Sequence, residues 1–178
     1  MLAVQMAWSL LEAEHRHMRA MLDEAVMLAG QGGGTCHAAT ARRVLPLLDE
    51  LEAFDKATHR PKGLTMLGTM KGRSAAADLH LDAMASARAR ADAALMHAKA
   101  LLKAAADGDI LAQSTCQSLL SGYREVLLQQ MDEEETLLRR HAESVLTQEE
   151  WSLLVSEMSS RLAAARPPPA SKDGGASH

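Results

Sequence analysis

Residues 75–106 read AAADLHLDAMASARARADAALMHAKALLKAAA, a stretch dominated by alanine and leucine. These residue types favour the α-helix over the β-strand. One stripe of the stretch repeats at the alternating spacing of four and three residues that faces the core of a helical bundle. Its members are Ala77, Leu81, Met84, Arg88, Ala91, Leu95, Ala98 and Leu102. We therefore expect a long helix inside a bundle, with one arginine on its inward stripe.

The sequence on either side of this stretch predicts further helices. Apolar residues at helical spacing extend over residues 2–28 and stop at the glycine-rich run 30–34. Two more long helices are expected over about 36–59 and 110–145, and a short one after the capping box Thr147–Glu150. Short connections between long helices favour antiparallel neighbours. The predicted fold is therefore all-α, an antiparallel up-down four-helix bundle with a short fifth helix.

The chain is expected to form one domain and a tail. A length of 178 residues suits a single domain with its own core, and we expect the bundle to occupy residues 1–163. Residues 63–73 carry three glycines, which weaken a helix, so we expect a frayed extension of the second helix there. Residues 164–178 are rich in proline, glycine and serine, and we expect them to be disordered.

Composition argues against several classes of partner. A formal net charge of -4 and only four aromatic residues provide neither a basic surface nor a base-stacking platform, so nucleic acid is not expected. No apolar run reaches the length of a membrane span and no signal peptide is recognisable, so we expect a cytoplasmic protein without a membrane partner. Cys36 and Cys116 suit reduced thiols in that compartment, with a single bridge between them as the alternative.

Polar residues interrupt the inward stripes of three helices. Besides Arg88, they are His15 on the first helix and Gln130, Glu134 and His141 on the fourth, where Leu137 shares the stripe. Burial of an ionisable group is costly unless the group is paired or bound to a metal. Two explanations stay open at this point: a polar layer that sets the register of the helices, or a metal site with ligands from several helices.

Several segments resemble motifs of the hemerythrin-like (HHE cation-binding) domains. Leu11-Glu-Ala-Glu-His15 looks like the first-helix motif, and His59-Arg-Pro-Lys-Gly63 is similar to the His-His-Pro-Lys-Glu segment of the second helix. Residues 123–138 resemble the fourth-helix stretch, in which a histidine precedes a glutamate by four residues, and residues 147–151 resemble the turn that follows. The resemblance covers roughly residues 5–160 and implies a helical bundle that holds two iron ions.

The resemblance assigns the family's metal-ligand positions to residues of this chain. His15, His59 and Glu134 match the ligands of the first, second and fourth helices and are the residual metal candidates. At the other three positions, Gly63 replaces a glutamate, and Arg88 and Gln130 each replace a histidine. Arginine stays protonated and cannot bind iron, so a di-iron site is not expected. We expect instead a buried Arg88–Glu134 charge pair, with Gln130 completing the hydrogen bonding.

Other histidines offer weaker candidates. His80 lies eight residues before Arg88, and a shifted register of the third helix would bring it closer to the site. His17 and His141 are candidate outer or replacement ligands, although exposure is the simpler expectation for both. No serine lies in a nucleophile elbow, and neither cysteine has a histidine at motif spacing. We therefore expect a protein that is not an enzyme.

Two functions follow from these patterns. The first is a hemerythrin-like module without a cofactor, non-catalytic or regulatory, that acts through an unknown protein partner or through self-association. The alternative is a non-heme iron protein that binds or senses oxygen, nitric oxide or redox state through a reduced or rearranged site with one or two iron ions. A small iron oxidase or peroxidase would need the same metal. The sequence favours the first function, because the residues at three ligand positions differ chemically from metal ligands. A conservative exchange would have kept a side chain that binds iron well.

Overall fold

The computed structural model describes residues 2–165, with side chains for residues 2–160. The helical elements are α1 (Leu2–Gly30), α2 (Ala38–Phe54), η1 (Asp55–His59), α3 (Arg60–Met70), α4 (Ala75–Ala106), α5 (Ile110–Glu133), η2 (Glu134–Leu138), α6 (Arg139–Val145) and α7 (Gln148–Ala165). The π-helical turns η1 and η2 join α2 to α3 and α5 to α6 without a break. Apart from the first two residues, at the end of α7, the expected disordered tail lies outside the described residues.

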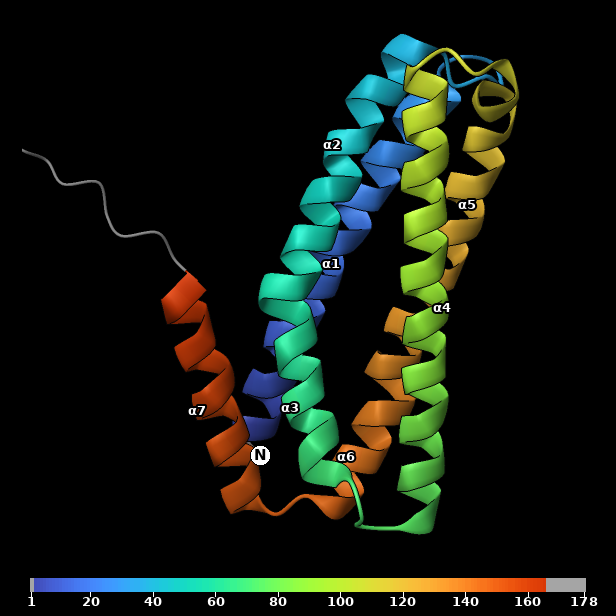
Figure 1. Ribbon diagram of the computed structural model, residues 1–178. Coiled ribbons are helices and arrows are strands. Elements are labelled where there is room, and N and C mark those ends of the chain that lie inside the picture. Colours follow the sequence, from blue (N-terminus) through green and yellow to red (C-terminus); the bar gives the residue numbers. More distant parts are fainter. Residues whose placement is uncertain (1, 166–178) are drawn as a thin grey trace, which may run out of the picture.

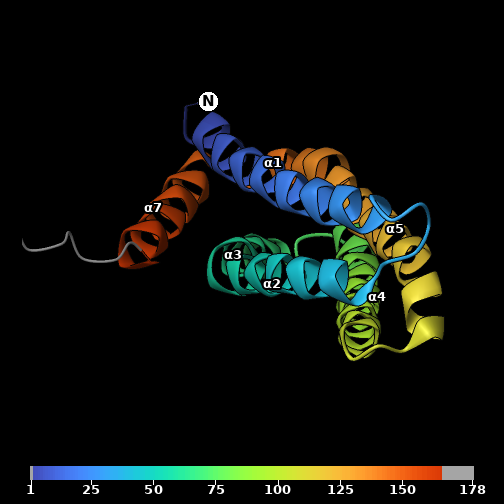
Figure 2. The same cartoon turned by 90° about the horizontal axis from the view of Figure 1, so that it is seen from above.

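Four long helical segments form an antiparallel bundle (Figure 1). α1 packs against α2 and α5, and α4 packs against the same two helices, which closes the bundle. α7 packs on the outside, against α1 and α3, and Figure 2 shows it on the side away from α4 and α5. The predicted all-α bundle with a fifth helix is confirmed, although α7 with 18 residues is longer than expected. None of the described helices has both the length and the apolar content to cross a membrane.

Local capping signals set the starts of α4, α5 and α7. The Ser74 side chain accepts a hydrogen bond from the backbone of α4 at 3.1 Å, and the Asp109 side chain does the same for α5 at 3.0 Å. Between them, Gly108 ends α4 with a φ of 99°, which a residue with a side chain rarely adopts. Thr147 and Glu150 form the reciprocal capping box that starts α7. These boundaries agree with the sequence because each depends on residues close together in the chain.

Residues 63–73 differ from the prediction of a frayed segment. α3 continues as a regular helix to Met70, and the side chains of Met66 and Met70 are fully buried. Burying one such side chain contributes about 1.5–3 kcal/mol. This exceeds the cost of about 1 kcal/mol for a glycine within a helix. Packing against distant parts of the chain therefore orders a segment that is weak on its own.

Two apolar clusters fill the ends of the bundle. One lies at the α1–α2 and α4–α5 connections and includes Leu48, Leu102 and Leu120. The other lies where α7 packs, and there the rings of Trp8 and Trp151 meet edge to face with centroids 6.3 Å apart. Polar residues that are buried in the described chain lie between the clusters: Glu14, His15, His59, Lys62, Gln130 and Glu134. This polar layer is the candidate site.

Candidate metal centre

The two π-helical turns carry two of the candidate ligands. His59 is the last residue of η1, and Glu134 is the first residue of η2. Such turns insert one residue into a helix and frequently occur at functional sites. η1 lies just before Pro61, which has no N–H and whose ring clashes with the carbonyl four residues earlier. The proline gives a local cause for η1, whereas nothing in the sequence of η2 explains the second turn.

η2 changes which residues face the core after Glu134. The prediction that Leu137 faces inward is wrong: Leu137 is 37% exposed, while Leu138 and Ala142 are 1% and 0% exposed. His141 is half-buried. The residue inserted by the π-helical turn moves the inward stripe one position along the chain. His141 therefore does not share the inward stripe with Glu134.

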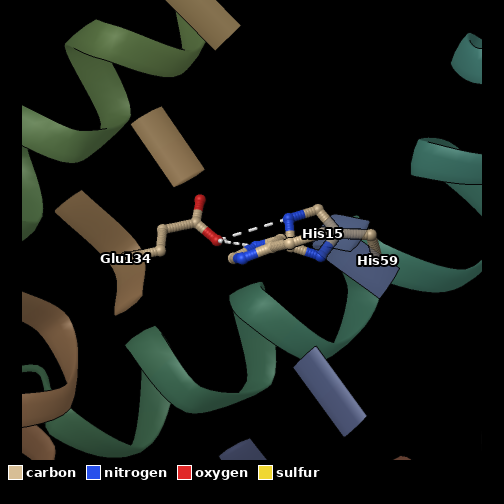
Figure 3. A group of neighbouring side chains, drawn as sticks. All are labelled: His15, His59 and Glu134. Carbon is tan, nitrogen blue, oxygen red and sulfur yellow. Dashed lines mark hydrogen bonds and ion pairs between the residues drawn. The ribbon is translucent and has the colours of Figure 1, made fainter. Parts of the chain in front are cut away.

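The carboxylate of Glu134 lies at the centre of the polar layer, and its two oxygens have different partners. Oε2 lies 3.3 Å from Nε2 of His15 and 3.3 Å from Nε2 of His59, as Figure 3 shows. Oε1 accepts hydrogen bonds from Nη2 of Arg88 at 3.2 Å and from Nε2 of Gln130 at 3.0 Å. The structure thus brings the three candidate ligands together. The predicted contact between Arg88 and Glu134, with Gln130 completing it, is confirmed.

Outer carboxylates orient both imidazole rings. Nδ1 of His15 donates to Oε1 of Glu135 at 2.7 Å, and Nδ1 of His59 lies 3.6 Å from Oε2 of Glu14. Neither Nδ1 of His59 nor Oε2 of Glu14 has a hydrogen-bond partner among the described residues. Because each Nδ1 faces a carboxylate, each Nε2 is directed toward Glu134. Metal-binding histidines are usually held in this way, by a carboxylate on the nitrogen that does not bind the metal.

Lys62 is a component of the site that sequence reasoning missed. Its side chain is 1% exposed, and its ammonium group forms an ion pair with Oε1 of Glu14. A buried ammonium group needs such a partner, because leaving water unpaired is costly. A signal was present in the sequence: Lys62 follows His59 by three residues and so shares its helix face, while Glu14 directly precedes His15.

Mutual contacts set the charges within the site. Burial alone would lower the pKa of His59, but the carboxylates of Glu134 and Glu14 raise it to about 9. Burial would raise the pKa of Glu134, yet contacts with His15, His59 and the Arg88 guanidinium hold it well below its usual range. In the absence of metal, His59 therefore carries a proton at neutral pH. A metal ion at His59 would have to displace that proton.

Gly63 and Arg88 together fill the other side of the site. A Cβ atom at Gly63 would lie 3.7 Å from Nη2 and 4.0 Å from Nη1 of Arg88. The guanidinium therefore lies beside the position from which a side chain at residue 63 would project. Its permanent positive charge repels a divalent ion. The three positions without a family-type ligand, Gly63, Arg88 and Gln130, are thus gathered on the Oε1 side of Glu134.

The donors on the Oε2 side fit one metal ion. His15, His59 and Glu134 each offer a ligand atom, and these atoms lie within 4.8 Å of one another. Ligands that share one first-row metal ion lie about 3.0–3.4 Å apart, because each bond to the metal is about 2.1 Å long. The two separations from Oε2 of Glu134, 3.3 Å each, agree with this spacing, and the ligand nitrogens of the two histidines lie within 4.8 Å of each other. Arg88 and Gln130 offer no comparable set, so the residues fit one ion and do not fit two.

A small cavity adjoins the site. It has a volume of about 20 Å³, and its lining includes His59, Arg88, Tyr123 and Gln130. One water molecule needs at least about 10–15 Å³ measured in this way. The cavity therefore admits a molecule of about the size of water and excludes a large substrate.

The remaining candidate histidines lie in other contacts. The ring of His80 pairs with that of His141, with centroids 5.2 Å apart, and the ring of His17 contacts Phe54 at 4.7 Å. Arg88, rather than His80, contacts Glu134. The shifted register of the third helix therefore does not occur.

Comparisons with known proteins identify the family of the chain. The search of curated proteins found no match, and the search of solved structures found none. The model of the hemerythrin HHE cation binding domain matches residues 6–142, a range that contains every residue of the site and most of the bundle. The chain therefore belongs to the hemerythrin HHE cation-binding domain family.

Proposed function

We propose that this protein binds one divalent transition-metal ion through His15, His59 and Glu134, in place of a di-iron centre. The observation that carries the proposal is the convergence of both histidine Nε2 atoms on Oε2 of Glu134, each at 3.3 Å. Two imidazoles and one carboxylate are the donor set of mononuclear non-heme iron(II) sites. Iron(II) is accordingly the ion that we propose, in keeping with the cation-binding family.

The proposed role is non-catalytic binding or sensing of a small molecule. Three protein ligands leave coordination positions free, and bound iron(II) would supply reversible affinity for oxygen or nitric oxide. The adjoining cavity of about 20 Å³ restricts access to molecules of that scale. Glu135 and Glu14 hold the two imidazoles in place, while Arg88 and Gln130 hold the far oxygen of Glu134. A cytoplasmic location suits this role and is part of the proposal.

A metal-free interaction module is the second candidate, and one observation favours it. Without any metal, the carboxylate of Glu134 already has partners on both oxygens, namely His15, His59, Arg88 and Gln130. In this case the polar layer would set the register of the helices, and the chain would act through a protein partner or through self-association. The two candidates differ in whether the histidines bind a metal.

Anaerobic titration with iron(II), monitored by calorimetry, separates the two candidate functions. The proposal expects saturable binding in the wild type and no measurable binding in His15→Ala and His59→Ala. His97 is exposed on α4, so His97→Ala is the matched control and should bind like the wild type. Circular dichroism checks that each variant is folded. Absence of binding in the wild type, or equal binding in all four proteins, would favour the metal-free module.

A further inference from the structure

Cys36 and Cys116 both belong to the apolar cluster at the connection end of the bundle. Both are free thiols, and their side chains are 0% and 1% exposed. The backbone N–H of Cys36 donates to the carbonyl of Gln113 at 2.8 Å. Gln113 and Cys116 lie three residues apart and so share a face of α5. The segment before α2 is thus held against the face of α5 that carries the second thiol, and the two cysteine side chains interact.

We propose that Cys36 and Cys116 form a reversible intramolecular disulfide when the protein meets a low-molecular-weight disulfide. The thiolate of Cys36 attacks one sulfur of the oxidant, forms a mixed disulfide and releases one small thiol. The thiolate of Cys116 then attacks the Cys36 sulfur and releases the second small thiol. Two protein thiols are oxidised, and one small disulfide is reduced to two thiols. The two protons lost by the cysteines pass to the released thiolates.

The surroundings of the pair predict which thiol reacts first and how fast. Burial raises the pKa of Cys36, and burial together with the nearby Cys36 raises the pKa of Cys116 to about 12. Few thiolates therefore form while the end of the bundle is closed. Cys36 lies two residues after the last glycine of the α1–α2 connection, where Gly33 and Gly34 have φ values of 64° and 99°. Local opening there exposes Cys36 before Cys116, which lies within α5.

The bond would tie two distant parts of the chain together. Residues 36 and 116 lie about 80 residues apart, and closing a loop of that length restricts the unfolded chain more than the folded one. The oxidised protein should therefore resist urea better than the reduced protein. The pair belongs to the cluster at the connection end and does not contact Glu134. The proposal is thus independent of whether the site binds a metal.

Incubation of the full chain with oxidised glutathione tests this inference. The expected result is slow loss of both free thiols, a tryptic cross-link between the peptides of Cys36 and Cys116, no covalent dimer, and a higher urea midpoint. Dithiothreitol should reverse all of these changes. Urea below the unfolding transition should accelerate the reaction, since it favours opening of the connection.

The single variants Cys36→Ala and Cys116→Ala provide the controls. Each should form at most a glutathione adduct and gain no resistance to urea on oxidation. The peptide map of the wild type decides the matter even if a variant folds poorly. Only glutathione adducts, only cross-links between chains, or unreacted thiols in the wild type at sub-denaturing urea would overturn the proposal.

Discussion

The two sides of the Glu134 carboxylate differ in the kind of positive charge that faces them. On the histidine side, Oε2 meets the Nε2 atoms of His15 and His59, two imidazole nitrogens that can bind a metal ion. On the arginine side, Oε1 meets Arg88, which cannot lose its proton, and Gln130, which carries no charge. Without metal, protonated His59 compensates the carboxylate on one side and the Arg88 guanidinium on the other, and only the first of these charges can be replaced by a metal ion.

This difference explains why the site fits one metal ion rather than two. The guanidinium of Arg88 supplies charge where a second ion would otherwise supply it, and Gly63 leaves room beside it. The histidine side keeps both its donors and the carboxylates that orient them, Glu135 and Glu14. The histidine side is therefore ordered even though the arginine side offers no comparable set of metal donors.

Replacing the shared carboxylate should have the largest effect. Glu134→Gln leaves Arg88 and the protonated His59 without their anion, and we expect a loss of about 3–5 kcal/mol in the free energy of unfolding, as well as loss of metal binding. Urea denaturation measures the first effect. Glu125→Gln, at an exposed position of α5, is the control and should change stability by less than about 0.5 kcal/mol. A loss below about 1 kcal/mol for Glu134→Gln would show that neither side depends on this charge.

The outer ion pair of the histidine side should show the next largest effect. Lys62→Met removes the ammonium partner of the buried Glu14 carboxylate and leaves it only the His59 ring, and we expect a loss of about 2–3 kcal/mol. The double variant Glu14→Gln with Lys62→Met should recover most of it, which a double-mutant cycle in urea measures. Lys56→Met, which removes an exposed pair with Glu52, should cost less than about 1 kcal/mol. Simple additivity of the two buried substitutions would contradict the pairing.

Removing the fixed cation should strengthen binding on the histidine side. Arg88→Met takes away a charge that repels the metal, and we expect about thirtyfold tighter binding of a divalent ion, or about 2 kcal/mol. Competition calorimetry with a chelator measures the change. Arg90→Met, at an exposed position of the same helix, should leave the affinity unaltered. Equal affinities in Arg88→Met and the wild type would show that the guanidinium charge does not weaken metal binding.

A pH series examines the exchangeable proton of the histidine side. The pKa of His59 is raised to about 9, so the metal competes with a proton below that pH. Apparent affinity should rise by up to about tenfold per pH unit between about pH 6.5 and 8.5 and level off above about pH 9. In the metal-free protein, the stability due to protonated His59 is fully present below about pH 6.5 and lost as the pH rises through about 9. A flat affinity profile would show that His59 is neutral in the metal-free site.

Periodicity in the sequence was sufficient to predict the bundle and much of the site. An inward stripe follows from residue spacing alone, which placed Arg88 and Glu134 on facing helices, where they do meet. The same reasoning predicted the inward position of His15, which is fully buried. The family resemblance supplied His59, which no stripe had marked.

What could not be predicted depends on contacts between distant segments or on irregular helix geometry. The π-helical turn at 134–138 moved the inward stripe from Leu137 to Leu138, and its sequence carries no signal for the extra residue. The Lys62–Glu14 pair requires the relative height of two helices, which spacing within one helix does not determine. The ordering of α3 depends on burial of Met70 rather than on local propensity.

The number of metal ions per chain tests the central claim most directly. After anaerobic loading with iron(II) and removal of unbound metal, the wild type should retain one ion per folded chain. The combined variant Gly63→Glu, Arg88→His and Gln130→His restores the family's ligand types on the arginine side, and it should retain two. A wild type that retains two ions, or none, would contradict the account of a half-retained centre.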